Sequence, residues 1–227
     1  KSFNNFYSSY FYNKKFKLPY ISAKIAISKD YFTINKKLRW ITNDQSKQVI
    51  HLLRSNNDCI ISTSKSVNSD NSLLNCRIEG LNNYKPDLLI IDSKLKLKKN
   101  LKLNKIIKKR KTFLITTEVN KIKTKIFKKK GYKIIIIESL SKKKDFILLF
   151  EQIYKLGYRR VFFESGLTFL NSLLKYKLLN KLYVLQNRNK LGKDGFNNNH
   201  TKNLKKIKLN KKVKVNLNDD TLYKIEF

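Results

Sequence analysis

The sequence predicts an α/β fold with a mostly parallel sheet. Several short apolar runs lack strict alternation, which is typical of parallel strands that are covered on both faces. Segments with the spacing of amphipathic helices lie between some of these runs. No internal repeat and no proline- or glycine-rich linker interrupts the 227 residues, so we expect one α/β domain.

The amino-terminal segment differs from the rest of the chain because it shows no hydrophobic periodicity. We therefore expect residues 1–17 to form a linker and residues 18–227 to form the domain. The domain begins with a predicted strand at residues 21–28, where apolar side chains alternate with polar or small ones.

A helix is expected after this strand. Thr42 and Gln45 have the spacing of a capping box, which indicates a helix start. The predicted helix continues to Arg54. Its apolar face is formed by Val49, Leu52 and Leu53.

Strands and helices alternate through the rest of the chain. Apolar runs predict strands at residues 59–62, 88–92, 112–116, 132–137, 160–164 and 181–186. Apolar residues at helical spacing predict a helix over residues 146–156, which Gly157 ends, and another helix over residues 167–179. We expect two or three further strands in the tail, residues 206–227.

The charge of the chain bears on its partners. A formal net charge of +35 would ordinarily indicate a nucleic-acid-binding protein. However, the basic residues are mostly lysines spread over the whole length, and the other abundant residues (Asn, Ile, Phe and Tyr) also have A/T-rich codons. Mutational bias therefore explains much of the charge, and we expect at most nonspecific binding of nucleic acid.

The sequence indicates neither a membrane segment nor a metal site. No apolar run approaches the roughly 20 residues that span a bilayer, and the polar amino terminus has no signal-peptide pattern. Cys59 and Cys76 fit no metal-ligand spacing, so we expect free thiols. We therefore expect a cytoplasmic protein without a metal.

One turn has the pattern of a phosphate-binding site. A predicted strand ends at Glu164, and Gly166 and a helix follow at once. The N–H groups of a first helical turn and the helix dipole favour an anion, and glycine permits a close approach. A full dinucleotide motif needs three glycines, so an ordinary strand-to-helix turn stays an equal alternative on this pattern alone.

An ordered set of short motifs resembles a known family. In chain order the motifs are Leu18-Pro19-Tyr20-Ile21, Lys24, Ser28 with Asp30, Trp40-Ile41-Thr42, Arg54, Asp70, Arg77, Ile91-Asp92-Ser93 and Glu164-Ser165-Gly166-Leu167-Thr168. The set is similar to the reductase domain of the bifunctional riboflavin-biosynthesis deaminase/reductase. The resemblance implies a dihydrofolate-reductase-like three-layer fold, with a mostly parallel central sheet and helices on both faces.

The resemblance also implies an activity and a site. Members of this family use NADPH to reduce 5-amino-6-(5-phosphoribosylamino)uracil to its ribitylamino product. The matching substrate positions are Arg54, Leu74, Arg77 and Glu164, and an arginine fork suits a phosphate. The matching cofactor positions are Ala26, Trp40, Ser66, Asp70, Ser93, Gly166, Leu167, Thr168, Phe169, Leu170, Asn171 and Ser172.

Reduction also needs a proton. The cofactor carries the hydride, so the protein has to supply orientation and a proton donor. Asp70, Glu164 and an ordered water are the candidate donors, and Lys24 is a candidate for orienting cofactor or substrate.

The chain departs from the family pattern at several places. Ser28-Lys29-Asp30-Tyr31 stands where the family has Ser-Leu-Asp-Gly, and Leu38 replaces a serine that contacts the substrate. A single glycine, Gly166, stands where paired glycines are usual. These replacements leave the charged residues of the predicted site in place.

The deaminase half of the family is excluded from this chain, because its zinc-binding pattern H-x-E…P-C-x-x-C is missing. We expect the deaminase either upstream in the same polypeptide or in a separate protein. A homodimer is expected from the resemblance.

Two alternatives differ in class. One is another reductase of the same fold, although arginines spaced for a phosphorylated substrate argue against a dihydrofolate reductase. The other is a basic nucleic-acid-binding or degenerate non-catalytic protein, because 12 Tyr and 14 Phe offer stacking surfaces.

The evenly spread lysines lead to a testable prediction about nucleic acid. We expect RNA and DNA to bind without sequence preference and with an affinity that falls steeply as salt rises, because binding releases counterions. Fluorescence anisotropy with unrelated oligonucleotides across a salt series measures both properties. Sequence-selective binding that persists at high salt would favour the nucleic-acid alternative.

Overall fold

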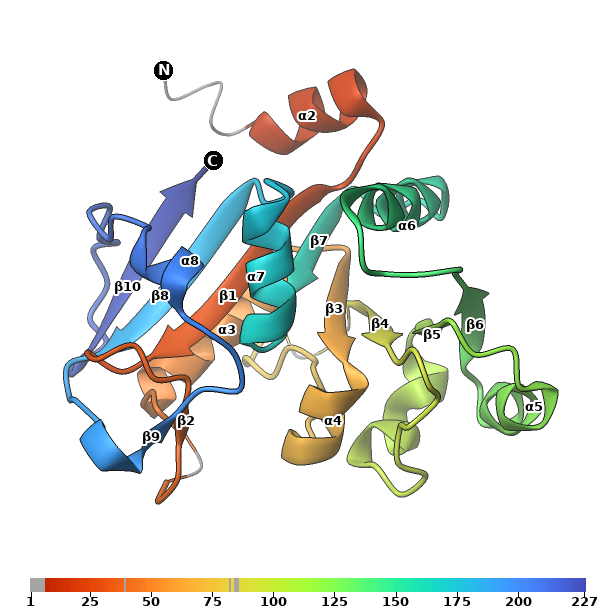
Figure 1. The fold of residues 1–227 in the computed structure, drawn as a ribbon, viewed down its shortest axis with the longest axis horizontal. Coiled ribbons are helices and arrows are strands. Elements are labelled where there is room, and N and C mark those ends of the chain that lie inside the picture. The colour runs from red at the N-terminus through yellow and green to blue at the C-terminus, as the bar shows by residue number, and fades with distance from the viewer. Residues whose placement is uncertain (1–6, 39, 82, 84–85) are drawn as a thin grey trace. The chain divides into compact units, whose positions relative to one another are not determined.

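The computed structural model describes residues 7–38, 40–81, 83 and 86–227. The chain forms two compact units. Figure 1 labels the helices and strands that make them up. Unit 1 consists of Lys1–Tyr20 and Arg54–Phe162, and unit 2 consists of Ile21–Leu53 and Phe163–Phe227. Each unit therefore combines segments that are far apart in the sequence.

The strands of unit 1 are mostly parallel. β3, β4, β5 and β6 pair in this order, each parallel to the next, and β7 lies beside β3. The three central residues of β4 are fully buried, as expected of a strand covered on both faces. The bounds are β3 Cys59–Thr63, β4 Asp87–Ile91, β5 Thr112–Thr116, β6 Lys133–Ile136 and β7 Arg160–Phe163. All five predicted strands are thus confirmed to within one residue at each end.

The helices of unit 1 are α2 Ser8–Phe16, α4 Ser64–Asp70, the 3-10 helix η1 Lys102–Lys109, α5 Lys121–Lys129 and α6 Lys143–Lys155. The predicted helix over residues 146–156 corresponds to α6. Its buried face contains Phe146, Leu149, Phe150 and Ile153. Gly157 ends the helix region with a φ of +98°, a conformation that glycine adopts without a steric penalty.

The helix α2 lies in the segment that we interpreted as a linker because it shows no hydrophobic periodicity. Its aromatic side chains stay largely exposed, as with Tyr10 and Phe11, so no buried stripe produces a period in the sequence. Buried Asn13 holds the helix in place. Its Nδ2 donates to the carbonyls of Leu18 (2.7 Å) and Arg159 (3.2 Å). The domain start at residue 18 stays a prediction.

Unit 2 contains three neighbouring strands and a separate two-stranded antiparallel pair. β1 Tyr20–Ile27 is parallel to β8 Lys181–Asn187, and β8 is antiparallel to β10 Asp220–Glu226. β2 Ile34–Asn35 pairs with β9 Gly195–Phe196. The helices are α3 Asp44–Ser55, α7 Leu167–Lys175, η2 Gly192–Asp194 and α8 Lys202–Lys205.

The start of α3 differs from the prediction. Asn43, not Thr42, caps the helix, because its Oδ1 accepts the amide of Ser46 at 3.0 Å. Asp220 and the carbonyl of Leu217 bind Asn43 in turn, so contacts distant in sequence select the cap. The buried face also differs from the predicted one: Leu52 is 45% exposed, and the buried residues are Ser46, Ile50 and His51.

The end of unit 2 is less regular than predicted. The helix α7 ends at Lys175 instead of residue 179, and Lys177 takes a left-handed φ of +54°. In the described tail β10 is the one extended strand, accompanied by an isolated bridge between Lys212 and Tyr223. The two or three strands expected in residues 206–227 are therefore reduced to one.

The turn after β1 contains a strained residue. Tyr31 has a φ of +67°, in the left-handed region that disfavours side chains with a Cβ. Hydrogen bonds hold the turn: Tyr31 N donates to the Ser28 carbonyl at 3.0 Å, and Ser28 Oγ donates to Asp30 at 2.6 Å. The resemblance leads us to expect a glycine at this position, and a glycine would adopt this φ without a steric penalty.

We therefore expect Tyr31→Gly to stabilise unit 2 by about 1 kcal/mol, because it removes the left-handed strain. Thermal and urea unfolding measure the change. Asn218→Gly is the matched control, since Asn218 has a φ of +53° and asparagine tolerates this conformation. Equal effects of the two substitutions would contradict the strain at Tyr31.

Candidate functional site

Two predicted substrate residues meet at the loop that follows α4. Arg54 lies in the last turn of α3, and its Nη1 donates to the carbonyl oxygen of Asn75 at 3.0 Å. Arg77 follows two residues later. Burial and the nearby charge of Arg54 lower the pKa of Arg77. Because the two guanidinium groups repel each other, an anion placed at them is favoured electrostatically.

Leu74 belongs to the same loop, but its side chain is not available for a ligand. It is 5% exposed and packs in the hydrophobic core of unit 1. Its φ is +49°, so the backbone turns sharply at this residue. A substrate contact at Leu74 therefore has to come from the backbone.

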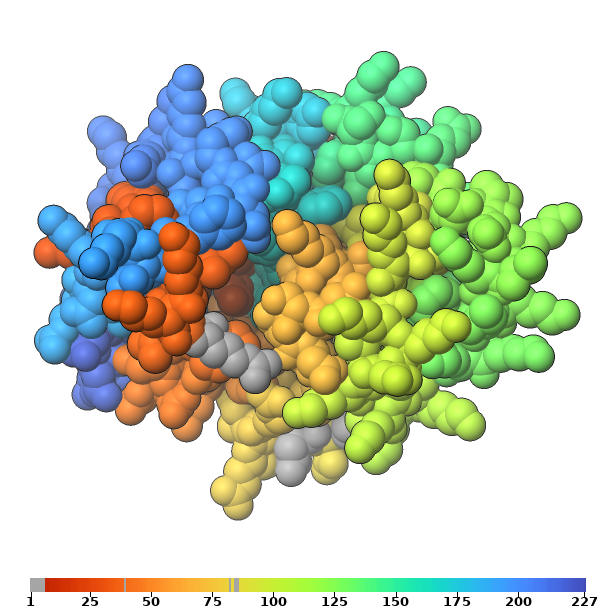
Figure 2. Space-filling view, turned by 60° about the horizontal axis from the view of Figure 1, so that its bottom comes forward, coloured from red at the N-terminus to blue at the C-terminus, as the bar shows by residue number. Residues whose placement is uncertain are grey.

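Three predicted cofactor residues follow strands of unit 1. Ser66 lies in the first turn of α4 after β3, Asp70 is the last residue of α4, and Ser93 follows β4. Since β3 and β4 are parallel, their carboxyl ends lie at the same edge. Hydrogen bonds join the segments after the two strands, and Figure 2 shows residues 64–80 and 92–110 side by side.

Unit 2 carries the remaining predicted residues. Lys24 and Ala26 lie on β1, opposite Tyr183 and Leu185 of β8. Trp40 is 45% exposed, and the Nζ of Lys47 lies 5.3 Å from its ring centroid. Trp40 is therefore not a core aromatic residue.

The start of α7 has the geometry expected of an anion site. Gly166 is the N-cap residue with an extended backbone, and no side chain caps the helix. A Cβ at Gly166 would meet nothing within 4 Å, which leaves room for a ligand beside the first turn. Glu164, just before it, is 8% exposed. These observations fit a phosphate group held by the N–H groups of the first turn.

The rest of the predicted run on α7 divides into two groups. Leu167 and Leu170 are buried, and Asn171 Nδ2 donates to the carbonyl of His200 at 2.7 Å, so these side chains serve the fold of unit 2. Gly166 and Thr168 are exposed. Phe169 and Ser172 are half-buried. Periodicity alone could have separated the two groups, because the buried positions recur at helical spacing.

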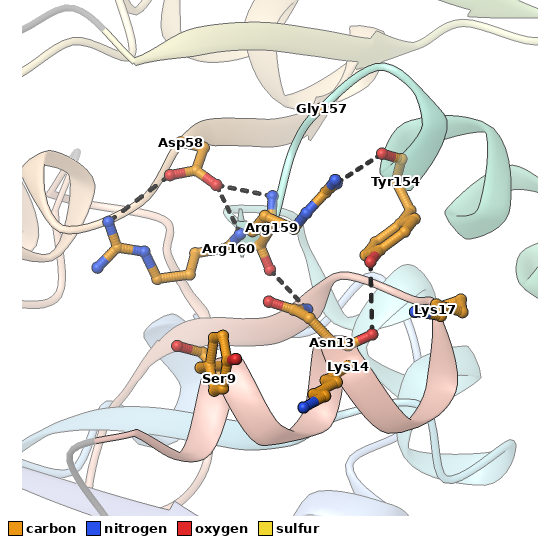
Figure 3. Close-up of a pocket in the computed structure, with 10 residues that line it drawn as sticks. Ser9, Asn13, Lys14, Lys17, Asp58, Tyr154, Gly157, Arg159 and Arg160 are labelled. Atoms are coloured by element: carbon orange, nitrogen blue, oxygen red, sulfur yellow. Dashed lines mark hydrogen bonds and ion pairs between the residues drawn. The ribbon is translucent and has the colours of Figure 1, made fainter.

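A cavity of about 670 Å³ lies between α2 and the start of β7 in unit 1 (Figure 3). Its two arginines are engaged with the protein: Arg160 pairs with Asp58 at 3.6 Å, and Arg159 donates to the carbonyl of Tyr154 at 2.7 Å. None of the predicted site residues lines it. The cavity is therefore separate from the candidate site.

Comparison with known proteins decides the family. Residues 19–219 match the family described as RibD C-terminal domain. The chain belongs to this family. It is also 31% identical, over 182 residues, to the riboflavin biosynthesis protein RibD of Buchnera aphidicola, an alignment that covers 74% of this chain and 47% of the relative. The chain thus spans about half the length of that relative.

Solved structures confirm the fold. RibD from Acinetobacter baumannii superposes with a TM-score of 0.79 at 18% identity, covering 98% of this chain and 62% of that one. The riboflavin biosynthesis reductase Rib7 of Saccharomyces cerevisiae gives 0.71 at 21% identity, with 100% and 99% covered. The predicted α/β fold of the dihydrofolate-reductase-like type, with a mostly parallel sheet flanked by helices, is confirmed.

A metal-binding cluster and a membrane-spanning helix are both absent from the part of the chain that the structure describes. No group of three or more His, Cys, Asp or Glu residues is placed to hold a metal ion. No helix there is both long and apolar enough to cross a bilayer.

This member of the RibD C-terminal domain family has an arginine near the predicted site that the sequence did not point to. Arg110 is buried, and its guanidinium donates to the carbonyls of Leu73 and Leu74. Arg110 lies just before a predicted strand, and the sequence around it matches no motif. The signal available was its chemistry, since arginine is rare in this lysine-rich chain.

The open first turn of α7 leads to a prediction. We expect Gly166→Val to weaken NADPH binding by about tenfold or more, with Gly166→Ala intermediate, because a side chain would fill the space beside the N–H groups. Quenching or enhancement of NADPH fluorescence measures the affinity. The fold should stay unchanged by circular dichroism, since the added Cβ meets nothing within 4 Å. Wild-type affinity in both variants would contradict the assignment.

Proposed function

We propose that this chain reduces 5-amino-6-(5-phosphoribosylamino)uracil to its ribitylamino product with NADPH, as a step of riboflavin biosynthesis. Membership of the RibD C-terminal domain family supports the reaction class. The observation that carries the substrate assignment is the pair of arginines at the loop after α4, because a phosphorylated sugar supplies the dianion that two guanidinium groups bind best.

The proposed substrate contacts come first from Arg54 and Arg77, which bind the phosphate. Arg54 already uses one Nη1 hydrogen on the Asn75 carbonyl, so its orientation is set before the ligand arrives. Leu74 contributes backbone, and Glu164 contributes a carboxylate to hydroxyl groups of the substrate. Preorganised charge of this kind reduces the cost of ordering on binding.

The proposed cofactor contacts begin at the start of α7. The N–H groups at Gly166, Leu167 and Thr168 hold phosphate, and the uncapped first turn of α7 fits this role. Exposed Trp40 offers an aromatic face. The remaining proposed contacts are Ala26, Ser66, Asp70, Ser93, Phe169 and Ser172, whereas the buried side chains of Leu170 and Asn171 hold α7 in unit 2. NADPH, when bound, supplies the hydride.

The protein's own chemistry is orientation and proton delivery. The carbon that accepts the hydride is C1′ of the opened ribose, and the adjacent heteroatom then needs a proton. We propose Asp70, Glu164 or an ordered water as its source. Lys24, half-buried on β1, orients cofactor or substrate.

The proposal extends to the surroundings of the enzyme. We propose a cytoplasmic homodimer and a deaminase that supplies the substrate, either upstream in the same polypeptide or as a separate protein. These proposals rest on the family.

The direct test is a turnover assay of the purified chain. Substrate-dependent oxidation of NADPH, followed by absorbance and accompanied by the ribitylamino product in mass spectrometry, would support the function. NADPH oxidation that does not depend on the substrate, or none at all, would reject it.

Conservative replacements test the arginine pair. We expect Arg54→Lys and Arg77→Lys each to raise the KM for the substrate by about 10- to 100-fold, because lysine keeps the charge and loses the bidentate fork. The KM for NADPH should change little. Arg188→Lys is the matched control, since Arg188 is exposed and pairs with Asp219. Should the KM for NADPH rise instead, the arginines belong to the cofactor.

A further inference from the structure

Arg110 is a charged residue in the interior of unit 1. It lies between η1 and β5 and is 8% exposed. Within the described residues no carboxylate forms an ion pair with it. Burying a guanidinium without a counter-ion is expensive unless its hydrogens are bonded, so its contacts need an explanation.

Those contacts are backbone carbonyls of two separate segments. Nη1 donates to the carbonyls of Leu74 (2.6 Å) and Pro86 (3.0 Å), and Nη2 donates to the carbonyl of Leu73. The rigid planar fork of arginine can reach all three acceptors at once. A lysine ammonium is a single point and cannot bridge the same positions.

The loop that Arg110 holds is the one that presents Arg77. Arg54 donates to the next carbonyl, that of Asn75, so two arginines bind three consecutive carbonyls. Leu74 keeps a left-handed φ of +49°, a conformation that is unfavourable for leucine and needs such support. The backbone that leads to Arg77 is therefore set by Arg110 and Arg54 together.

The charges in this loop region point to an anion. Burial and the charge of Arg54 lower the pKa of Arg110 to about 10, and the same two causes lower the pKa of Arg77. The charge of Arg54 thus acts on both of the other guanidinium groups. An anion bound at Arg54 and Arg77 would relieve this repulsion, while buried Arg110 itself stays out of reach of a ligand.

We propose that Arg110 is a positioning residue that fixes the backbone of residues 73–77, so that Arg54 and Arg77 are ready for the substrate phosphate. The role in substrate binding rests on the proposed function. The role in ordering the loop is independent of it.

Three variants test the proposal. Arg110→Met keeps the aliphatic stem and removes every hydrogen bond to the loop. Arg110→Lys keeps the charge and removes the fork. Arg159→Met is the matched control, because Arg159 also donates to a backbone carbonyl, that of Tyr154, and lies at the separate cavity of Figure 3.

Amide hydrogen exchange of residues 73–78 and steady-state kinetics are the readouts. Both Arg110 variants should exchange about tenfold faster in this segment. Both should raise the KM for the phosphorylated substrate by about 10- to 100-fold, while the KM for NADPH stays within about twofold. The control should change none of these quantities. If Arg110→Met does not fold, Arg110→Lys decides the question.

The outcomes separate the two proposals. Wild-type exchange in residues 73–78 of Arg110→Lys, with an unchanged KM for the substrate, would overturn the positioning role. A wild-type chain without turnover would reject the proposed function, and the exchange experiment would still decide whether Arg110 orders the loop. Equal rises in both KM values would also overturn the role, because general loosening would explain them.

Discussion

Backbone groups in loops that pack against the core need hydrogen-bond partners, and a few buried charged side chains supply them in this protein. Asp92, 2% exposed, accepts two loop amides at 2.8 Å each. In unit 2, Asp220 accepts the amide of Asn43 at 2.9 Å. Arg110 plays the corresponding part for carbonyl groups, because its guanidinium donates hydrogen bonds to three of them. A shift of any of these loops would leave a buried charged side chain without its hydrogen bonds. The buried side chains therefore fix the positions of the loops.

This constraint explains how the chain tolerates changes in its turns. In the turn after β1, Tyr31 is strained by its left-handed φ of +67°. Its hydrogen bonds nevertheless persist. Burial alone would raise the pKa of Asp30, but bonds from Ser28 and from the amides of Gly192 and Leu191 lower it. The turn therefore keeps its conformation although one residue no longer suits it.

The strands of the sheet were predictable because their signal is local. Runs such as residues 88–91 are apolar throughout, as expected of a strand that is covered on both faces. Gly157 likewise marks a helix end through its own φ. The arginine pair was found through chemistry, since a fork that binds phosphate is distinctive in a lysine-rich chain. The helix α2 escaped prediction because its aromatic side chains bury no stripe.

The sequence by itself determined the alternation of strands and helices and the family, and it led to the proposal that Arg54 and Arg77 bind a phosphorylated substrate. Only the tertiary structure decided which side chains cap the helix α3 and fix the loop at Leu74. Asn43 caps α3 in place of Thr42 because Asp220, far along the chain, binds its backbone. Arg110 holds the loop at Leu74 because folding brings a buried guanidinium to carbonyls 36 positions away. Local sequence patterns indicate which residues are buried and whether they form a helix or a strand. A hydrogen-bond partner that is distant in the chain is determined only when the core packs.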